Sequence, residues 1–171
     1  MSSQKRIALT GFMGVGKSSV ARHLANLSGQ QRVDLDSYIE HREGRQIASI
    51  LDADGEPAYR EIESAALAHL LENEPVPILS LGGGTWTIER NRELLHKYGF
   101  MALWLEASFE HCWLNIAFSR KTRPLARDRA AAEKLFNERQ KTYCLADWHF
   151  IVRPDLTSFD VARQIHEELF A

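Results

Sequence analysis

The chain has 171 residues, with 21 basic and 23 acidic side chains and a net charge of −2 at pH 7. This length suits one domain over residues 1–171, which can bury a core without disulfides or structural metals. The balanced charge argues against nucleic acid or an anionic membrane as a partner, and no apolar run approaches the ~20 residues that a membrane span needs. Cys112 and Cys144 show neither C-x-x-C nor metal-ligand spacing, so we expect buried, reduced thiols and a cytoplasmic protein.

A phosphate-binding motif follows the first predicted strand, Ile7–Leu9. Residues 11–18, Gly-Phe-Met-Gly-Val-Gly-Lys-Ser, match the pattern G-x-x-x-x-G-K-[ST]. In this pattern backbone N–H groups surround phosphate oxygens, Lys17 adds a positive charge, and the hydroxyl of Ser18 suits Mg²⁺. A helix predicted after the motif, ending at Gly29, points the positive end of its dipole at the same anion. The motif therefore predicts a nucleotide site; the alternative is an ordinary glycine-rich turn.

Short apolar runs alternate with helical spacings along the rest of the chain. The runs that we expect to form strands are Ile7–Leu9, Val33–Leu35, Ile78–Leu81, Met101–Leu105 and Phe150–Val152. This alternation is typical of an α/β fold in which helices cover both faces of a five-stranded parallel sheet, a three-layer α/β/α arrangement. A ligand of such a fold binds at the carboxyl ends of the strands. We also expect Trp104, Trp113 and Trp148 in the core, because they occur in or near apolar runs.

Two aspartates occur at the end of the second predicted strand. Asp34 and Asp36 are two residues apart, so in a strand their side chains would share one face. One carboxylate could hold Mg²⁺ through water, and the other could accept a proton from a hydroxyl that attacks a γ-phosphate. The alternative is a pair of solvated acids.

Three further features lie where a second ligand and a cover could be. Arg60 and Glu63 are three residues apart on a predicted helix and could form an ion pair, the alternative being a plain surface pair. Residues 82–84, three consecutive glycines after the third strand, offer backbone amides without side chains, which indicates a close approach. Residues 119–129 are rich in charge and interrupted by Pro124, so we expect a mobile lid that excludes water.

Taken in order, these motifs resemble those of the shikimate kinase family. The resemblance runs from about Ile7 to Tyr143 through G-x-x-G-x-G-K-S, Asp-x-Asp, Gly-Glu-x-x-Tyr-Arg-x-x-Glu, Leu-Gly-Gly-Gly, Arg-Pro-Leu and Glu-Arg-x-x-x-Tyr. It implies a single-domain P-loop kinase with a nucleoside-monophosphate-kinase-like fold. It also implies transfer of the γ-phosphoryl group of ATP, with Mg²⁺, to the 3-hydroxyl of shikimate in aromatic amino-acid biosynthesis. We expect the protein to be a monomer.

The resemblance further implies roles for individual residues. Asp36 would act as the base, with Lys17 and Arg123 as further catalytic residues, and Mg²⁺ would be held by Ser18 and, through water, by Asp34. The nucleotide would contact Gly14, Val15, Gly16, Lys17, Ser18, Ser19, Arg120 and Arg123. The acceptor would contact Asp36, Arg60, Gly82, Gly83, Gly84 and Arg139, and the arginines of this set would hold its carboxylate.

Three positions depart from the pattern of the family. Ala126 follows Arg-Pro-Leu where members commonly have leucine, Leu51 stands where a phenylalanine borders the substrate pocket, and Trp86 is bulkier than expected. These departures leave the acceptor range open. One alternative is a related P-loop small-molecule kinase, of the gluconate kinase type, with a different hydroxyl acceptor. Another is a regulatory module that binds ATP without transfer, although no residue needed for the chemistry is missing.

Overall fold

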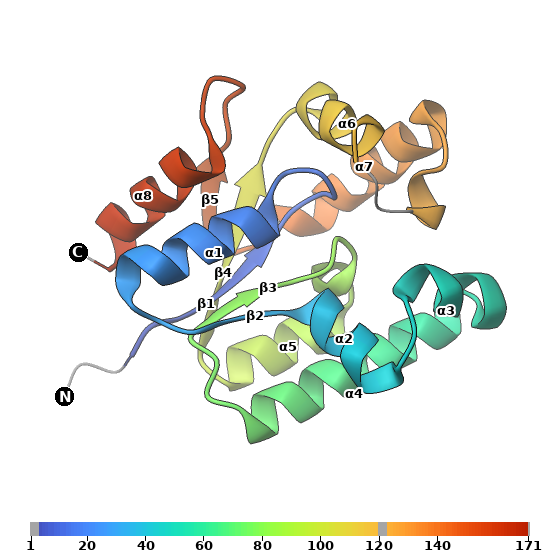
Figure 1. Cartoon of the computed structure of the whole chain (residues 1–171), viewed down its shortest axis with the longest axis horizontal. Coiled ribbons are helices and arrows are strands. Elements are labelled where there is room, and N and C mark those ends of the chain that lie inside the picture. The colour runs from blue at the N-terminus through green and yellow to red at the C-terminus, as the bar shows by residue number, and fades with distance from the viewer. Residues whose placement is uncertain (1–3, 120–122, 171) are drawn as a thin grey trace.

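The computed structural model describes residues 4–119 and 123–170. Its central sheet has five strands, all paired in parallel, in the order β2-β3-β1-β4-β5 (Figure 1). The strands are β1 (Arg6–Thr10), β2 (Arg32–Asp34), β3 (Ile78–Ser80), β4 (Phe100–Glu106) and β5 (Trp148–Ile151). The predicted α/β fold is confirmed, and its strands lie within two residues of their predicted bounds.

Eight α-helices and two short 3₁₀ helices surround the sheet in the described part of the chain. They are α1 (Lys17–Ser28), α2 (Leu35–Glu43), α3 (Ile47–Asp54), α4 (Glu56–Asn73), η1 (Thr85–Thr87), α5 (Glu89–Lys97), α6 (Phe109–Ala117), η2 (Pro124–Ala126), α7 (Arg129–Tyr143) and α8 (Ser158–Leu169). Helices α1 and α8 pack together on one side of the sheet, and α4 and α5 lie on the other (Figure 1). None of these helices is both long and apolar enough to cross a membrane.

Local sequence signals explain where several helices begin and end. Helix α1 ends at Gly29, as predicted, because Gly29 adopts a left-handed conformation with φ of 69° and its N–H donates to the carbonyl of Ala25. Helix α8 begins with a capping box between Thr157 and Asp160. In the central strand β1, Ile7, Ala8 and Leu9 are buried, as expected for a parallel sheet covered on both faces.

The interpretation of the two aspartates as strand neighbours is wrong. Strand β2 ends at Asp34, which caps helix α2: its carboxylate accepts a hydrogen bond from the backbone N–H of Ser37 at 3.0 Å. Asp36 therefore lies in the first turn of α2, not in a strand. An aspartate cap satisfies an N–H group that the helix leaves without a partner, and this stabilisation ends the strand early.

Two predictions about buried side chains are wrong in part. Trp148 lies on the edge strand β5 and is 41% exposed, whereas Trp104 is buried and Trp113 partly buried. Cys112 is buried, but Cys144 is exposed at the end of α7. Burial raises the pKa of the Cys112 thiol to about 11, so it remains protonated near neutral pH.

Candidate active site

The loop between β1 and α1 forms the predicted phosphate-binding site. Gly14 and Gly16 have φ values of 83° and 103°, in the region that favours glycine. The ammonium group of Lys17 donates to the backbone carbonyls of Gly11 at 2.7 Å and of Phe12 at 3.1 Å. From α6, the side-chain amide of Asn115 donates to the carbonyl of Gly14 at 2.7 Å. The loop is thus held in shape with its lysine at the amino end of α1.

The charge of Lys17 is sensitive to its surroundings. Burial lowers the pKa of Lys17 to about 8, although the carboxylate of Asp36 favours its charged form. Arg123 and Arg139 add further positive charge near the lysine and lower its pKa. A concentration of positive charge beside a glycine-rich loop is suited to an anionic ligand such as a polyphosphate.

Beside this loop, Asp34 is held by a set of hydroxyl groups. Its Oδ1 atom accepts hydrogen bonds from Ser18 and Ser80, each at 2.7 Å, and its Oδ2 atom accepts from Ser37. Burial raises the pKa of Asp34, but these hydrogen bonds outweigh burial and hold the pKa below its usual value. An ionised carboxylate and a serine hydroxyl at the end of a phosphate-binding loop are oxygen donors of the kind that Mg²⁺ prefers.

Two adjoining cavities meet at the carboxyl ends of the strands. The first, about 420 Å³, lies along the phosphate-binding loop and is lined by Gly14, Gly16, Lys17, Ser18, Ser19, Asp34, Asn115 and Ser158, among others. The second, about 610 Å³, is lined by Arg60, Glu63, Gly84 and Arg139 and by apolar side chains that include Leu51 and Leu125. Both cavities share Met13, Asp36, Gly82, Gly83 and Arg123. Asp36 therefore lies at their junction.

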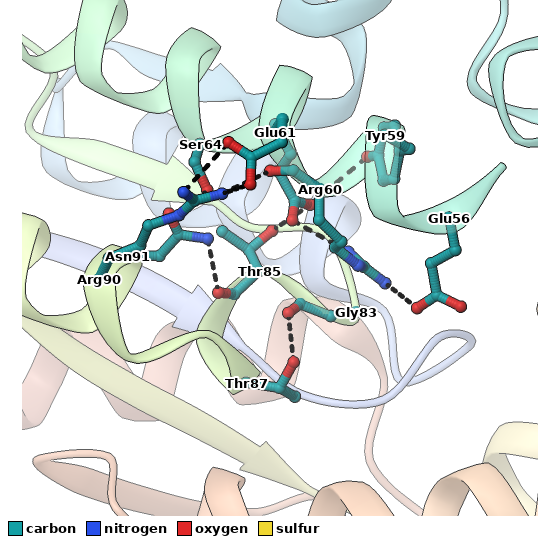
Figure 2. Close-up of polar contacts among 12 residues, drawn as sticks. Glu56, Tyr59, Arg60, Glu61, Ser64, Gly83, Thr85, Thr87, Arg90 and Asn91 are labelled. Atoms are coloured by element: carbon teal, nitrogen blue, oxygen red, sulfur yellow. Dashed lines mark hydrogen bonds and ion pairs between the residues drawn. The ribbon is translucent and has the colours of Figure 1, made fainter. Parts of the chain in front are cut away.

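Arg60 extends into the second cavity from α4, where buried Glu63 holds it. Its Nη1 atom donates to Glu63 at 2.9 Å and its Nη2 atom to Glu56 at 3.4 Å. Glu63 is fully buried and also accepts a hydrogen bond from the hydroxyl of Thr85 at 2.8 Å. Figure 2 shows Arg60 reaching toward Glu56, with Thr85 and the loop of Gly83 nearby. The predicted pair of Arg60 and Glu63 is confirmed, and it is not a plain surface pair.

The second arginine, Arg139, comes from α7 and is only 6% exposed. Its Nη1 atom has no hydrogen-bond partner among the described residues. One turn later, the hydroxyl of Tyr143 donates to the carbonyl of Gly83, and the indole N–H of Trp86 donates to the carbonyl of Thr142 at 3.0 Å. Helix α7 thus holds both Arg139 and the glycine loop. A buried guanidinium with an unsatisfied donor is suited to a ligand carboxylate or phosphate.

Most of the residues predicted for the site line one cavity or the other. Val15 is an exception: it is buried, its side chain lines neither cavity, and its N–H donates to the carbonyl of Phe12. Arg120 lies outside the described residues, as does part of the predicted lid. Trp86 is buried behind the glycine loop, whereas Leu51 lines the second cavity directly. No motif marks Asn115, which the sequence analysis missed.

The fold and the two cavities define a P-loop kinase that acts on a small molecule. Comparison with known proteins identifies the family, because the shikimate kinase family model matches residues 13–170. A shikimate kinase of Helicobacter hepaticus is 32% identical over 164 residues, which cover 95% of each chain. A shikimate kinase of Ruegeria pomeroyi is 37% identical over 146 residues, which cover 84% of this chain and 73% of its relative.

A solved structure of a shikimate kinase has the same fold as this chain. The shikimate kinase from Acinetobacter baumannii in complex with shikimate has a TM-score of 0.88 to this chain at 29% identity, covering 98% of this chain and 93% of that one. The chain belongs to the shikimate kinase family, which confirms the resemblance found in the sequence. It is accordingly an ATP-dependent kinase that transfers a phosphoryl group to an alcohol.

Proposed function

We propose that this kinase phosphorylates the 3-hydroxyl group of shikimate. The proposal rests on the composition of the second cavity, which is lined by two arginines and by the carboxylate of Asp36 that it shares with the first cavity. Shikimate is a compact ring with one carboxylate and three hydroxyl groups. Guanidinium groups from two different helices fix both the charge and the orientation of such a ligand, because each binds a carboxylate through a planar fork.

The nucleotide occupies the first cavity in this proposal. Backbone N–H groups of the loop and the ammonium group of Lys17 bind the phosphates, as the arrangement at the start of α1 favours. Ser18 and Asp34 are the residues that would hold Mg²⁺, with Asp34 acting through water, and the ion would neutralise phosphate charge when bound. The hydroxyl of Ser18 and the carboxylate of Asp34 lie 2.7 Å apart, and both are oxygen ligands that suit such an ion. Arg120 is assigned to the nucleotide by the resemblance alone.

The acceptor occupies the second cavity. Arg139, with its unsatisfied Nη1, and Arg60, held by Glu63, bind the carboxylate of shikimate. Backbone groups of Gly82, Gly83 and Gly84 border the ring and its hydroxyls. Because Asp36 lines both cavities, an acceptor hydroxyl beside it also faces the phosphate-binding loop.

The transfer is a single displacement at phosphorus. The 3-hydroxyl oxygen forms a bond to the γ-phosphorus while the bond from that phosphorus to the β–γ bridging oxygen breaks, and ADP leaves. The hydroxyl proton passes to the carboxylate of Asp36. Lys17 and Arg123 neutralise the negative charge that develops on the transferring group and the leaving oxygen. Burial lowers the pKa of Arg123, but an arginine side chain remains positively charged near neutral pH.

Water must be excluded, because it is itself a phosphoryl acceptor. Arg123, Pro124 and Leu125 line the second cavity together with Leu51 of α3. We therefore assign residues 119–129 to a lid that closes when ATP and shikimate are both bound, with Arg123, which lines both cavities, beside the phosphates. All the residues assigned to the site belong to one chain, so a monomer suffices. We place this enzyme in the cytoplasm, where ATP is available.

A coupled ADP-release assay tests the proposal. The acceptors compared are shikimate, quinate, gluconate and nucleoside monophosphates, each with ATP and Mg²⁺. ADP release that depends on shikimate and not on the other acceptors supports the proposal. A signal with gluconate but not shikimate would favour the related sugar-acid kinase, and ATP binding without ADP release for any acceptor would favour the regulatory module.

A further inference from the structure

The three glycines after β3 are not required by their backbone conformation. Gly82, Gly83 and Gly84 are absent from the glycines with positive φ in the described chain. Gly84 has φ of −107° and ψ of −5°, values that residues with side chains also adopt. Alanine at positions 82–84 would therefore not meet the backbone strain that alanine would meet at Gly14 or Gly16. Some other property of the loop must call for glycine.

That property is space, and each glycine leaves space for a different charged side chain. A Cβ atom on Gly82 would lie 2.7 Å from Oδ1 of Asp36. On Gly83 it would lie 2.9 Å from Nη1 of Arg139, and on Gly84 it would lie 2.6 Å from Cζ of Arg60. Ordinary contacts of a carbon atom are about 3.5–4.0 Å, so each of these side chains would have to move.

We propose that the glycine loop, residues 82–84, is a positioning element in which each glycine sets the place of one charged group of the acceptor site. Gly82 sets the place of Asp36, Gly83 that of Arg139, and Gly84 that of Arg60. The proposal rests on the proposed function, since it assigns these three groups to the acceptor. It differs from a role of the glycines as amide donors, because it acts through side chains on α2, α4 and α7.

Hydrogen bonds hold the backbone of the loop in place. The carbonyl of Gly83 accepts a hydrogen bond from Tyr143, and the carbonyl of Gly84 accepts one from the hydroxyl of Thr87 at 2.6 Å. At the start of the loop, the N–H of Leu81 donates to the carbonyl of Leu9 in β1 at 3.0 Å. At Gly83 and Gly84 we therefore expect the far end of an arginine, which is flexible, to move and not the loop; at Gly82 we expect the carboxylate of Asp36 to move.

Displacement of Arg60, Arg139 or Asp36 should change the kinetics with shikimate in a way that depends on the side chain. In Gly84→Ala, Arg60 leaves the position in which Glu63 holds it at 2.9 Å. We expect a rise of about 10- to 100-fold in the KM for shikimate, the usual cost of losing a hydrogen bond between charged groups, with a smaller change in kcat. Gly83→Ala acts in the same way through Arg139. Gly82→Ala acts through Asp36 and lowers kcat more than it raises KM.

Double-mutant cycles with shikimate as the varied substrate test this assignment. In the matched pair, Gly84→Ala adds nothing to the KM of Arg60→Ala, because the group that it displaces is already gone. In the mismatched pair, Gly84→Ala still raises the KM of Arg139→Ala, because Arg60 is present and is displaced; the factor can differ from that in the wild type, since both arginines bind one carboxylate. For Gly83→Ala the matched variant is Arg139→Ala, in which it should add nothing, and the mismatched variant is Arg60→Ala, in which it should raise the KM. Equal factors in matched and mismatched backgrounds would overturn the proposal.

A control variant separates the effect of space from the effect of losing a glycine. Gly29 has a positive φ of 69° but no atom within 4 Å of an added Cβ. Gly29→Ala should lower the free energy of unfolding and leave the KM for shikimate unchanged. Gly84→Ala should raise the KM for shikimate, and it should also lower the free energy of unfolding, because buried Glu63 loses its partner. The change in KM is therefore the result that distinguishes the two variants.

A crystal structure of ligand-free Gly84→Ala gives a readout that does not depend on the substrate. We expect Arg60 displaced from Glu63 while the loop backbone keeps its place. An unmoved Arg60 with a shifted loop would refute the proposal. If the wild type failed to phosphorylate shikimate, the proposed function would fail, and this structural result would still decide whether the glycines position the arginines.

Discussion

The guanidinium of Arg60 and the carboxylate of Glu63 form an ion pair of 2.9 Å on one turn of α4, with the carboxylate fully buried. Burial lowers the pKa of Arg60, but the charge of Glu63 and the hydrogen bond to it outweigh burial and raise the pKa above its usual value. The same carboxylate accepts from Thr85, so it joins the arginine to the start of η1. The pair thus fixes a positive charge at the wall of the acceptor cavity.

Neutralising this buried carboxylate should weaken the acceptor site. We expect Glu63→Gln to raise the KM for shikimate about tenfold, because a charge-assisted hydrogen bond that orients Arg60 is lost, and to change the Kd for ATP little. Glu61→Gln is the matched control on the same helix, where the glutamate pairs with Arg90 at 2.8 Å on the surface. Steady-state kinetics that gave the same KM for both variants would contradict the role of Glu63.

Removing the charge of Asp36 should slow the chemistry. We expect Asp36→Asn to lower kcat by about 10²- to 10⁴-fold, the usual contribution of a positioned base, and to leave ATP affinity nearly intact. Asp54→Asn, at an exposed position, serves as the control and should be neutral. Unchanged turnover in Asp36→Asn, measured by rapid-quench ADP formation, would remove this residue from the mechanism.

The depressed pKa of Lys17, about 8 in the ligand-free protein, predicts proton uptake on nucleotide binding. Phosphate charge raises this pKa in the complex, so above pH 8 the complex holds more protons than the separate molecules. The Kd for ATP should therefore rise with pH, by at most about tenfold per pH unit above 8. Calorimetry in two buffers of different ionisation enthalpy measures the uptake. Lys17→Arg, charged throughout this range, should show none; equal uptake in both proteins would exclude Lys17 as its source.

The buried indole of Trp86 predicts a stability effect. Trp86→Phe leaves the carbonyl of Thr142 without its partner at 3.0 Å and should lower the free energy of unfolding by about 1–3 kcal/mol. Trp148→Phe, the control on exposed β5, should change it by about 0.5 kcal/mol or less. Urea unfolding followed by circular dichroism gives both values. A neutral Trp86→Phe would mean that this hydrogen bond does not stabilise the fold.

The sheet could be predicted because parallel strands buried on both faces are continuous apolar runs. The run at Ile7–Leu9 lies within β1 for this reason. The same signal was misleading at the edge, where Trp148 lies in an apolar run but remains exposed because no strand covers the outer side of β5 in the described sheet. At Asp34, a helix cap competes with a strand end, and spacing alone does not distinguish them.

The phosphate-binding loop could be predicted in detail because one short segment contains all of its parts. The acceptor cavity combines residues from distant segments: Tyr143 and Gly83 are 60 residues apart, and Trp86 and Thr142 are 56 apart. No local pattern encodes such contacts. The family resemblance indicated Arg60, Arg139 and the glycines, but the space that each glycine leaves for one charged side chain is evident only in three dimensions.

In the proposed function, the hydroxyl group phosphorylated in the second cavity is the 3-hydroxyl of shikimate. The most direct measurement is nuclear magnetic resonance of the product formed from ATP, Mg²⁺ and shikimate, with phosphorus–proton coupling used to locate the phosphate. We predict one product, with coupling from phosphorus to the proton on C3, and one ADP for each product molecule. Two results would contradict this function. One is phosphate on another hydroxyl group of shikimate, and the other is release of ADP and inorganic phosphate with no phosphorylated shikimate.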